Sequence, residues 1–449
     1  MTTTPSRTTK SRPRRRPAGP ADGRHATAVR MRPRHSMEGN AAGPHRSTPI
    51  PEPPPLPRTH RAAPTRRVYL AAALLRCALY LGPLSVAVAA GAQLAQVAWP
   101  VPLGTLLLGW TAAQALTSAG VAVAGRAGTA AACRLVGAGF AATAGLWCAL
   151  VWVAPDALVG PHRTLALVVG LGGLASLATV TAALVSRGEA AIVRWSLPCW
   201  LLALATLAGL LDDHLWRTEL PALPIGTLLP AAIVAALIRA FRPALLPGPR
   251  PRIRLDPGDR DRAVGYLVIG ASQAACVGVL WQAGPTGSTV PLWLPLLLAV
   301  PILEALIGWD TDQVGEADHD DGRHVRGVTL ITLAGLVPPL AVGTALFSAA
   351  YRMAPALTAP VGGRPGVLAL AGGTLLGGVL AITFLLAARG RTAVAAAVAM
   401  APLLVTAGLE VLPRPAAGPL PEAVAVLAVT HLAGLLIVAL TAADPRRTP

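Results

Sequence analysis

Charged and aromatic residues are scarce in this chain. Only 13% of its 449 residues are Asp, Glu, Lys or Arg and 4% are Phe, Trp or Tyr, whereas 53% are hydrophobic. A soluble domain needs a far more polar surface, so the composition excludes a soluble globular protein. The sequence therefore predicts an integral membrane protein.

Lysine is almost absent, since Lys10 is the only lysine among 38 basic residues. The net charge of +17 is carried by arginine, which is concentrated in the N-terminal tail and on alternate loops. Such an Arg, Ala, Gly and Pro excess without Lys is typical of a GC-rich bacterial genome. Arginine on alternate loops indicates positive-inside anchoring in a lipid bilayer, and we favour this interpretation over nucleic-acid binding.

Motifs of enzymes and metal sites are also missing. The sequence contains neither a GxxxxGK[ST] phosphate loop nor HExxH, and no two cysteines have CxxC spacing. These absences predict a protein that is not an enzyme and that has no cofactor or metal. The five cysteines lie in or beside apolar segments and are interpreted as small buried residues: Cys77, Cys133, Cys148, Cys199 and Cys276.

Long apolar segments dominate the rest of the sequence. Each has about 20 residues, the length that crosses about 30 Å of hydrocarbon at 1.5 Å per residue. The sequence therefore predicts an all-α polytopic membrane protein with about 12 transmembrane helices. The predicted spans are 77–97, 101–124, 135–154, 164–185, 192–211, 223–241, 263–283, 290–309, 327–350, 366–388, 392–412 and 422–442.

These segments divide the chain into five parts. Residues 1–66 are rich in Pro and Arg and have no apolar periodicity, so we expect a disordered cytoplasmic tail without a cleaved signal peptide. Six spans in residues 67–241 form a first bundle and six in residues 263–442 form a second. A cytoplasmic linker at 242–262 joins them, and residues 443–449 form a cytoplasmic C-terminal tail.

The two sets of six spans share landmarks in the same order. The matched pairs include Arg76 with Arg262, Tyr80 with Tyr266 and Gln114 with Glu304. Because each half has an even number of spans, both halves start on the same side of the membrane. The repeat is therefore predicted to be parallel, an architecture typical of carriers with a substrate path between their halves.

The distribution of arginine on the loops predicts the orientation. Arg126 with Arg134, Arg187 with Arg194 and the arginines of residues 242–262 all lie on even loops, which we place in the cytoplasm with both termini. The segment 310–326 is acidic and contains two histidines, His319 and His324. Its irregular spacing favours a solvated linker over a cation site.

Polar residues inside apolar spans are the candidates for function, since a charged side chain at the bilayer centre costs at least about 2.5 kcal/mol. Glu304 replaces Gln114 at the equivalent position of the second half, and Gln273 could line the same path. A carboxylate facing an amide across a pseudo-two-fold axis indicates a substrate or coupling site. The alternative is that Glu304 is solvated near the interface or paired with an arginine.

Three further residues have competing interpretations. Arg76 and Arg262 are predicted to anchor the cytoplasmic boundary of spans one and seven, with an anionic-headgroup site at Arg76 as the alternative. His431 lies near the middle of the last span. It could relay protons, although a lone helical histidine is more often a packed, hydrogen-bonded residue.

Proline and glycine interrupt several spans. Pro338 and Pro339 are predicted to break the ninth span and to free carbonyls that a neighbouring helix or water must satisfy. Glycines at 170–173 and at 372–378 are predicted to permit close helix packing and not to cradle a phosphate.

Two carrier superfamilies combine two parallel six-helix bundles with a long cytoplasmic loop. The major facilitator superfamily has a loop-two signature of which Gly120–Thr129 keeps Arg126 and Gly128 but lacks the acidic residue and the trailing basic pair. The chain resembles more the multidrug-extrusion and lipid-linked-glycan flippase superfamily, in span count and in the strong repeat signal of spans one to two and seven to eight.

That resemblance implies alternating access, with the two bundles rocking about a central cavity. Carboxylates that extrusion members place in spans one and seven are missing here, so a lipid-linked or amphipathic substrate fits better than cation-coupled drug export. Two other classes are kept as alternatives: a small-molecule exporter of the major facilitator type, and a non-transporting membrane scaffold or envelope-biogenesis subunit.

Overall fold

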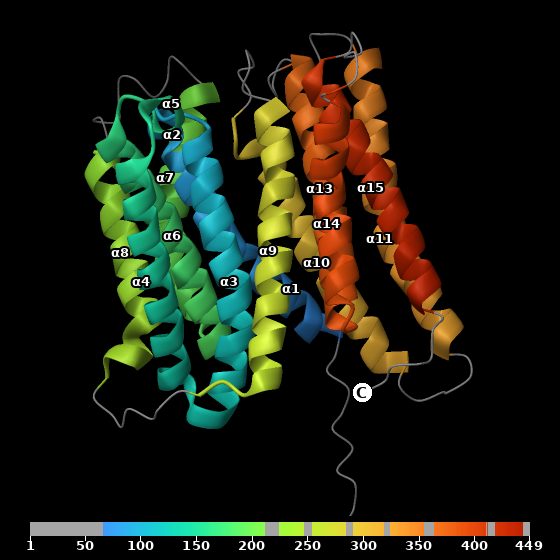
Figure 1. Cartoon of the computed structure of the whole chain (residues 1–449), viewed down its shortest axis with the longest axis horizontal. Coiled ribbons are helices and arrows are strands. Elements are labelled where there is room, and N and C mark those ends of the chain that lie inside the picture. Colours follow the sequence, from blue (N-terminus) through green and yellow to red (C-terminus); the bar gives the residue numbers. More distant parts are fainter. Residues whose placement is uncertain are drawn as a thin grey trace, which may run out of the picture. The chain divides into compact units, whose positions relative to one another are not determined.

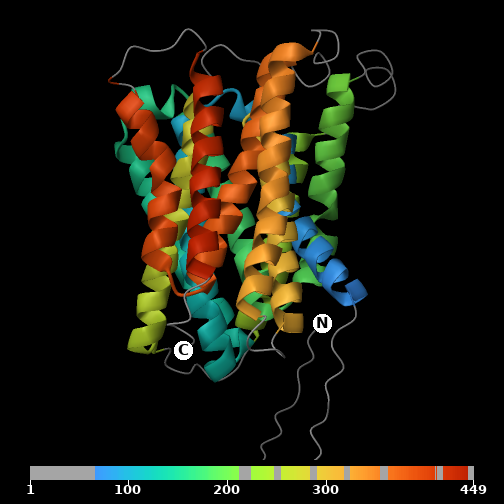
Figure 2. The same ribbon diagram turned by 90° about the vertical axis from the view of Figure 1, so that its right-hand side faces the viewer.

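The computed structural model describes residues 66–211, 224–246, 254–283, 291–317, 324–353, 363–409, 411 and 418–442 (Figures 1 and 2). Residues 1–65 of the tail predicted to be disordered lie outside the described residues. The C-terminal tail 443–449 also lies outside them. His319 of the acidic segment also lies outside them.

The described residues form long helices joined by short connections, with two helices of four residues, α2 (Gly91–Leu94) and α5 (Asp156–Val159). Eleven of the described helices contain segments long and apolar enough to cross a membrane, and α10 contains a shorter apolar segment, Leu294–Ile307. The prediction of an all-α polytopic membrane protein is confirmed. The long helices are α1 (Arg66–Ala89), α3 (Pro100–Ala127), α4 (Thr129–Val153), α6 (Arg163–Ser186), α7 (Glu189–Leu211), α8 (Ile225–Leu245), α9 (Pro257–Ala283), α10 (Leu294–Ala317), α11 (His324–Arg352), α13 (Gly363–Ala388), α14 (Thr392–Leu409) and α15 (Pro419–Ala442).

Two predicted boundaries were wrong. Helix α1 covers residues 66–89 and its apolar span is Ala71–Ala89, so Arg76 lies within the span and not at its edge. The prediction of 77–97 assumed that a charge ends a span, but the long arginine side chain lets a helix continue past it. The acidic segment is also partly helical, because α10 continues to Ala317.

The same helix pairs are in contact in each half. We call α1 to α8 the first half and α9 to α15 the second half. Every contact between long helices of the first half has its counterpart in the second when α1, α3, α4, α6, α7 and α8 are matched with α9, α10, α11, α13, α14 and α15. The halves meet mainly through α3 with α9 and through α1 with α10 (Figure 1). These two contacts are equivalent, because α3 is matched with α10 and α1 is matched with α9. Figure 2 shows the start of α1 and the end of α15 at the same end of the helices, as an even number of crossings requires.

Helices α6 and α13 occupy the centres of their halves, and 89% of the apolar window of α13 is buried. Glycine makes this possible. A β-carbon added at Gly373 would lie 2.1 Å from the carbonyl oxygen of Pro295, and one added at Gly377 would lie 2.7 Å from that of Ala299. Lipid tails are as apolar as leucine, so membrane helices associate through such close backbone packing. The predicted packing role of these glycines is confirmed.

The central helices also end in the same way. A left-handed residue follows each helix, Arg187 (φ 55°) after α6 and Gly390 (φ 74°) after α13. The next amide then donates back into the last turn, from Gly188 to the Ala183 carbonyl and from Arg391 to the Leu386 carbonyl, both at 2.9 Å. This is the Schellman motif, which satisfies carbonyls that the helix leaves unpaired.

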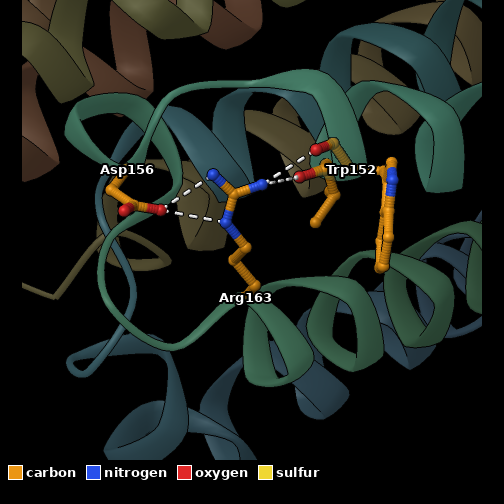
Figure 3. A network of polar contacts seen from close by, with 4 residues as sticks. Trp152, Asp156 and Arg163 are labelled. Atoms are coloured by element: carbon orange, nitrogen blue, oxygen red, sulfur yellow. Dashed lines mark hydrogen bonds and ion pairs between the residues drawn. The ribbon is translucent and has the colours of Figure 1, made fainter.

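The turn between α4 and α6 is held by Arg163 (Figure 3). Its guanidinium donates to the carbonyls of Val151 and Trp152, at 3.2 and 2.8 Å, and pairs with the Asp156 carboxylate at 2.8 Å. A cation at a helix C-terminus satisfies the last carbonyls and complements the helix dipole. This arginine lies on a predicted external loop, where its role is to cap α4.

Candidate functional site

The two halves are packed most closely where α3 meets α9. A β-carbon added at Gly270 of α9 would lie 3.0 Å from Cγ of Gln114 and 3.1 Å from Cα of Thr111, both on α3. Farther along, one added at Gly278 would lie 3.1 Å from a side-chain carbon of Leu103. Glycine on α9 thus lets the halves approach to backbone distance at Gln114, one of the predicted site residues.

A chain of hydrogen bonds crosses this contact. Trp110 of α3 donates its indole N–H to Oε1 of Gln273 on α9 at 2.8 Å, and Gln273 donates from Nε2 to the Thr383 hydroxyl on α13 at 2.8 Å. Gln273 is 3% exposed and Thr383 is fully buried. Both the oxygen and the nitrogen of the Gln273 amide are therefore hydrogen-bonded, which keeps the free-energy cost of burying this polar group low. Ser272 points its hydroxyl at the Val268 carbonyl of its own helix and does not join this chain.

A charged cluster lies at the other contact between the halves, where α1 meets α10. Glu304 is 5% exposed and interacts electrostatically with Arg76 of α1 and Glu189 of α7. The Arg76 guanidinium lies 4.0 Å from the Glu189 carboxylate. The structure therefore does not show Glu304 as a solvated interfacial residue. Glu304 is a buried carboxylate near Arg76, and Arg76 also pairs with a second acid, Glu189.

Tyr80 connects the charged cluster to the hydrogen-bonded chain. It interacts electrostatically with Glu304 and Arg76. Its ring also lies against that of Trp110, with 6.1 Å between centroids and a tilt of 54°. Polar and aromatic side chains therefore lie at both contacts between the halves, with Tyr80 on α1 near Glu304 on α10 and against Trp110 on α3, which donates to Gln273 on α9. We call this set the seam network: Glu304, Arg76, Glu189, Tyr80, Trp110, Gln273 and Thr383.

Ion pairs of Arg126 join the two halves where α3 ends and α9 begins. Arg126 in the last turn of α3 pairs with Asp256 and with Asp259, the latter at 2.6 Å. A cation at a helix C-terminus and acids at a helix N-terminus both complement the helix dipoles. Asp259 is the more enclosed of the two acids, with 18% of its side chain exposed against 70% for Asp256. Arg262, by contrast, is exposed on α9, one turn before Tyr266.

His431 lies within the second half and not at the seam. Its ring is fully buried, with Nε2 2.9 Å from the Leu336 carbonyl of α11 and Nδ1 3.4 Å from the Leu375 carbonyl of α13. A β-carbon added at Gly378 would lie 1.9 Å from the imidazole, so this glycine makes the room for the ring. Leu336 lies two residues before Pro338 in α11. This helix continues through both prolines, so the predicted break of the span is not seen. The geometry agrees with the packed, hydrogen-bonded interpretation.

Replacing His431 with leucine should destabilise the protein by about 1–3 kcal/mol, because the Leu336 carbonyl would lose its side-chain donor inside a buried contact. Thermal unfolding of the purified protein in detergent measures the effect. Thr430→Val is the matched neighbour, since Thr430 is also buried and donates only to the Val426 carbonyl of its own helix. Equal melting temperatures for the two variants would show that the hydrogen bond from His431 to Leu336 does not stabilise the protein.

Sequence reasoning identified Gln114, Gln273, Glu304 and Arg76 but missed their partners. Trp110 and Thr383 are ordinary residues of apolar spans, and no sequence signal points to them. Glu189 had a signal that was not used. It follows Arg187 and Gly188 and is an acid at the start of an apolar span on a predicted cytoplasmic loop, where it can face Arg76.

Comparison with known proteins rests on structure alone, because no family model matches the sequence and no curated protein matches it. The solved structure of a multidrug resistance MATE family transporter of the MOP superfamily, in its outward-facing conformation, is similar with a TM-score of 0.51 and 14% identity over 84% of this chain and 94% of that one. An inward-facing structure from the same family has a TM-score of 0.46 at 13% identity, covering 82% and 94%. A eukaryotic MATE transporter has 0.47 at 12%, covering 84% and 97%. The first of these similarities confirms the predicted resemblance at the level of architecture: the chain has the fold of a MATE transporter of the MOP superfamily.

Proposed function

We propose that this chain is a multi-pass membrane transporter that works by alternating access, with residues 67–241 and 263–442 as the two moving halves. The observation that carries the proposal is the matched set of helix contacts in the two halves, held together mainly at α3 with α9 and at α1 with α10. Such a pseudo-two-fold arrangement gives two equivalent seams about which rigid bundles can rock. The MATE fold supports the same mechanism.

The seam network is the proposed substrate and coupling region. In the described conformation Gln273 and Glu304 are 3% and 5% exposed, so this region is closed. Opening the seams would expose the amide of Gln273, the indole of Trp110 and the phenol of Tyr80 together with the charged cluster at Glu304. We propose that Glu304 binds the coupling ion or a substrate group, and that Arg76, which Glu189 shares, partly compensates its charge when the seam is closed.

The substrate is proposed to be lipid-linked or amphipathic. The groups that would line an open seam combine aromatic and neutral polar side chains with one charged cluster, which suits an amphipathic molecule better than one that is charged throughout. The basic even loops support a bacterial cytoplasmic membrane with both termini in the cytoplasm. A non-transporting scaffold is the alternative, and the close packing at Gly270 is the observation in its favour.

Distance measurements between the halves test the proposal. With the five cysteines replaced, spin labels at Leu245 of α8 and Leu440 of α15 lie on exposed positions of different halves, 67% and 77% exposed. Alternating access should give two distance populations whose ratio changes when amphipathic drugs or lipid-linked glycans are added. A control pair within the first half, Val121 with Leu245, should give one population throughout. A single unchanging distance for the pair between halves would favour the scaffold.

A further inference from the structure

An apolar groove runs between α11 and α15 on the second half, outside the seam network. It has a volume of about 420 Å³, within the size range of sites that hold organic ligands. Its walls are formed mainly by Val337, Leu340, Ala341 and Thr344 on α11 and by Val429 and Leu432 on α15. Val429 is 67% exposed and Leu432 48%, so the groove is open to the surroundings of the helices.

The side chains that line the groove leave an occupant no free hydrogen-bond donor. Thr344 is the polar residue among those that line it, and its hydroxyl already lies 2.8 Å from the Leu340 carbonyl and 3.0 Å from that of Ala341, to which it back-bonds. The other lining side chains are aliphatic. An occupant that needs polar partners would lose them on entering, whereas a hydrocarbon chain loses nothing.

The depth of the groove determines which molecules can reach it. The lining residues lie near the middle of the spans Thr332–Arg352 and Pro419–Thr441. In a bilayer this is the hydrocarbon core, where the surrounding molecules are lipid acyl chains. A soluble ligand or a protein domain outside the membrane would have to pass the headgroup region to reach it.

We propose that the groove binds an acyl chain of a bilayer phospholipid, which fills the gap between α11 and α15 beside Pro338-Pro339. Val337 precedes the two prolines and Leu340 follows them, so one chain contacts α11 on both sides of this pair. Neither proline can donate a backbone hydrogen bond, so α11 is less constrained here by its own ladder. The His431 imidazole holds the adjacent Leu336 carbonyl from the protein side, and the lipid chain supports the outer side.

Photo-crosslinking tests the proposal in purified full-length protein. The protein is reconstituted into nanodiscs of phosphatidylglycerol with a diazirine in mid-chain, with no lipid-linked substrate present. Adducts on Val429 and Leu432 should exceed those on Leu146 and Leu150 of α4 by about threefold, because a groove contacts a chain on two sides and a convex helix face on one. The α4 residues are 50% and 46% exposed and supply the baseline of ordinary lipid contact.

Filling the groove provides the matched comparison. Ala341→Phe places a ring in the groove at an exposed position, so folding is spared, and it should lower the adducts on α15 to the α4 level. Ala142→Phe, on the exposed face of α4, should leave the adducts on α15 unchanged. Equal labelling of α15 and α4 in the parent protein overturns the proposal. A dimer in native mass spectra of the same nanodiscs, with α15 left unlabelled, also overturns it, because this result assigns the groove to a second copy of the chain.

Discussion

Gly373→Val is expected to prevent recovery of stably folded protein from the membrane. A β-carbon at this position would lie 2.1 Å from the Pro295 carbonyl oxygen, 2.8 Å from the carbonyl carbon and 2.9 Å from Cα. All three are backbone atoms, so no side-chain rotation relieves the contact and α10 must move away from α13. Overpacking that shifts a backbone costs about 1–3 kcal/mol or more. Because α13 touches every other long helix of the second half, the displacement is expected to spread through that half.

Thermal unfolding in detergent measures this effect, with size-exclusion chromatography used to monitor how much folded protein remains. Gly145→Val in α4 is the control, since a β-carbon there meets nothing within 4 Å and the change in helix propensity is the same. Gly377→Val should resemble Gly373→Val, because its β-carbon would approach the Ala299 carbonyl oxygen to 2.7 Å. If all three variants melt together, close packing of α13 against α10 is not what stabilises the second half.

Glu304→Gln is expected to reduce transport at least about tenfold, which corresponds to about 1.4 kcal/mol. The substitution keeps the size of the side chain and removes its charge, so it should abolish ion or substrate binding while leaving the fold intact. A strain lacking the gene, tested for accumulation of a lipid-linked intermediate or for altered drug sensitivity, supplies the assay. The variant should fail to restore the parental phenotype although it is present in the membrane in normal amounts.

Glu422→Gln is the matched control for this experiment. Glu422 is a half-buried acid in the first turn of α15, and it is not part of the seam network. It should restore the phenotype fully. Full restoration by Glu304→Gln as well would remove Glu304 from the mechanism without deciding against alternating access, which the spin-label distances test independently.

Several features of the fold were predictable because they depend on local sequence. Apolar length predicts helices that can cross a membrane, and the glycines of 372–378 predict a tightly packed helix, as Gly373 and Gly377 show. The position of Arg76 was not predictable in the same way. Charge on a side chain indicates where a helix meets water only when that side chain has no partner inside the protein, and Arg76 has acidic neighbours in Glu189 and Glu304.

The sequence by itself determined that this is a polytopic helical membrane protein with related halves, and it singled out Gln114, Gln273 and Glu304 as unusual. Tertiary structure alone decided that Gln273 bonds Trp110 and Thr383, and that His431 binds the Leu336 carbonyl of α11. The physical reason is that lipid and the protein interior are both apolar. Hydropathy therefore does not distinguish the two faces of a membrane helix, and the packing of distant segments decides which polar groups meet.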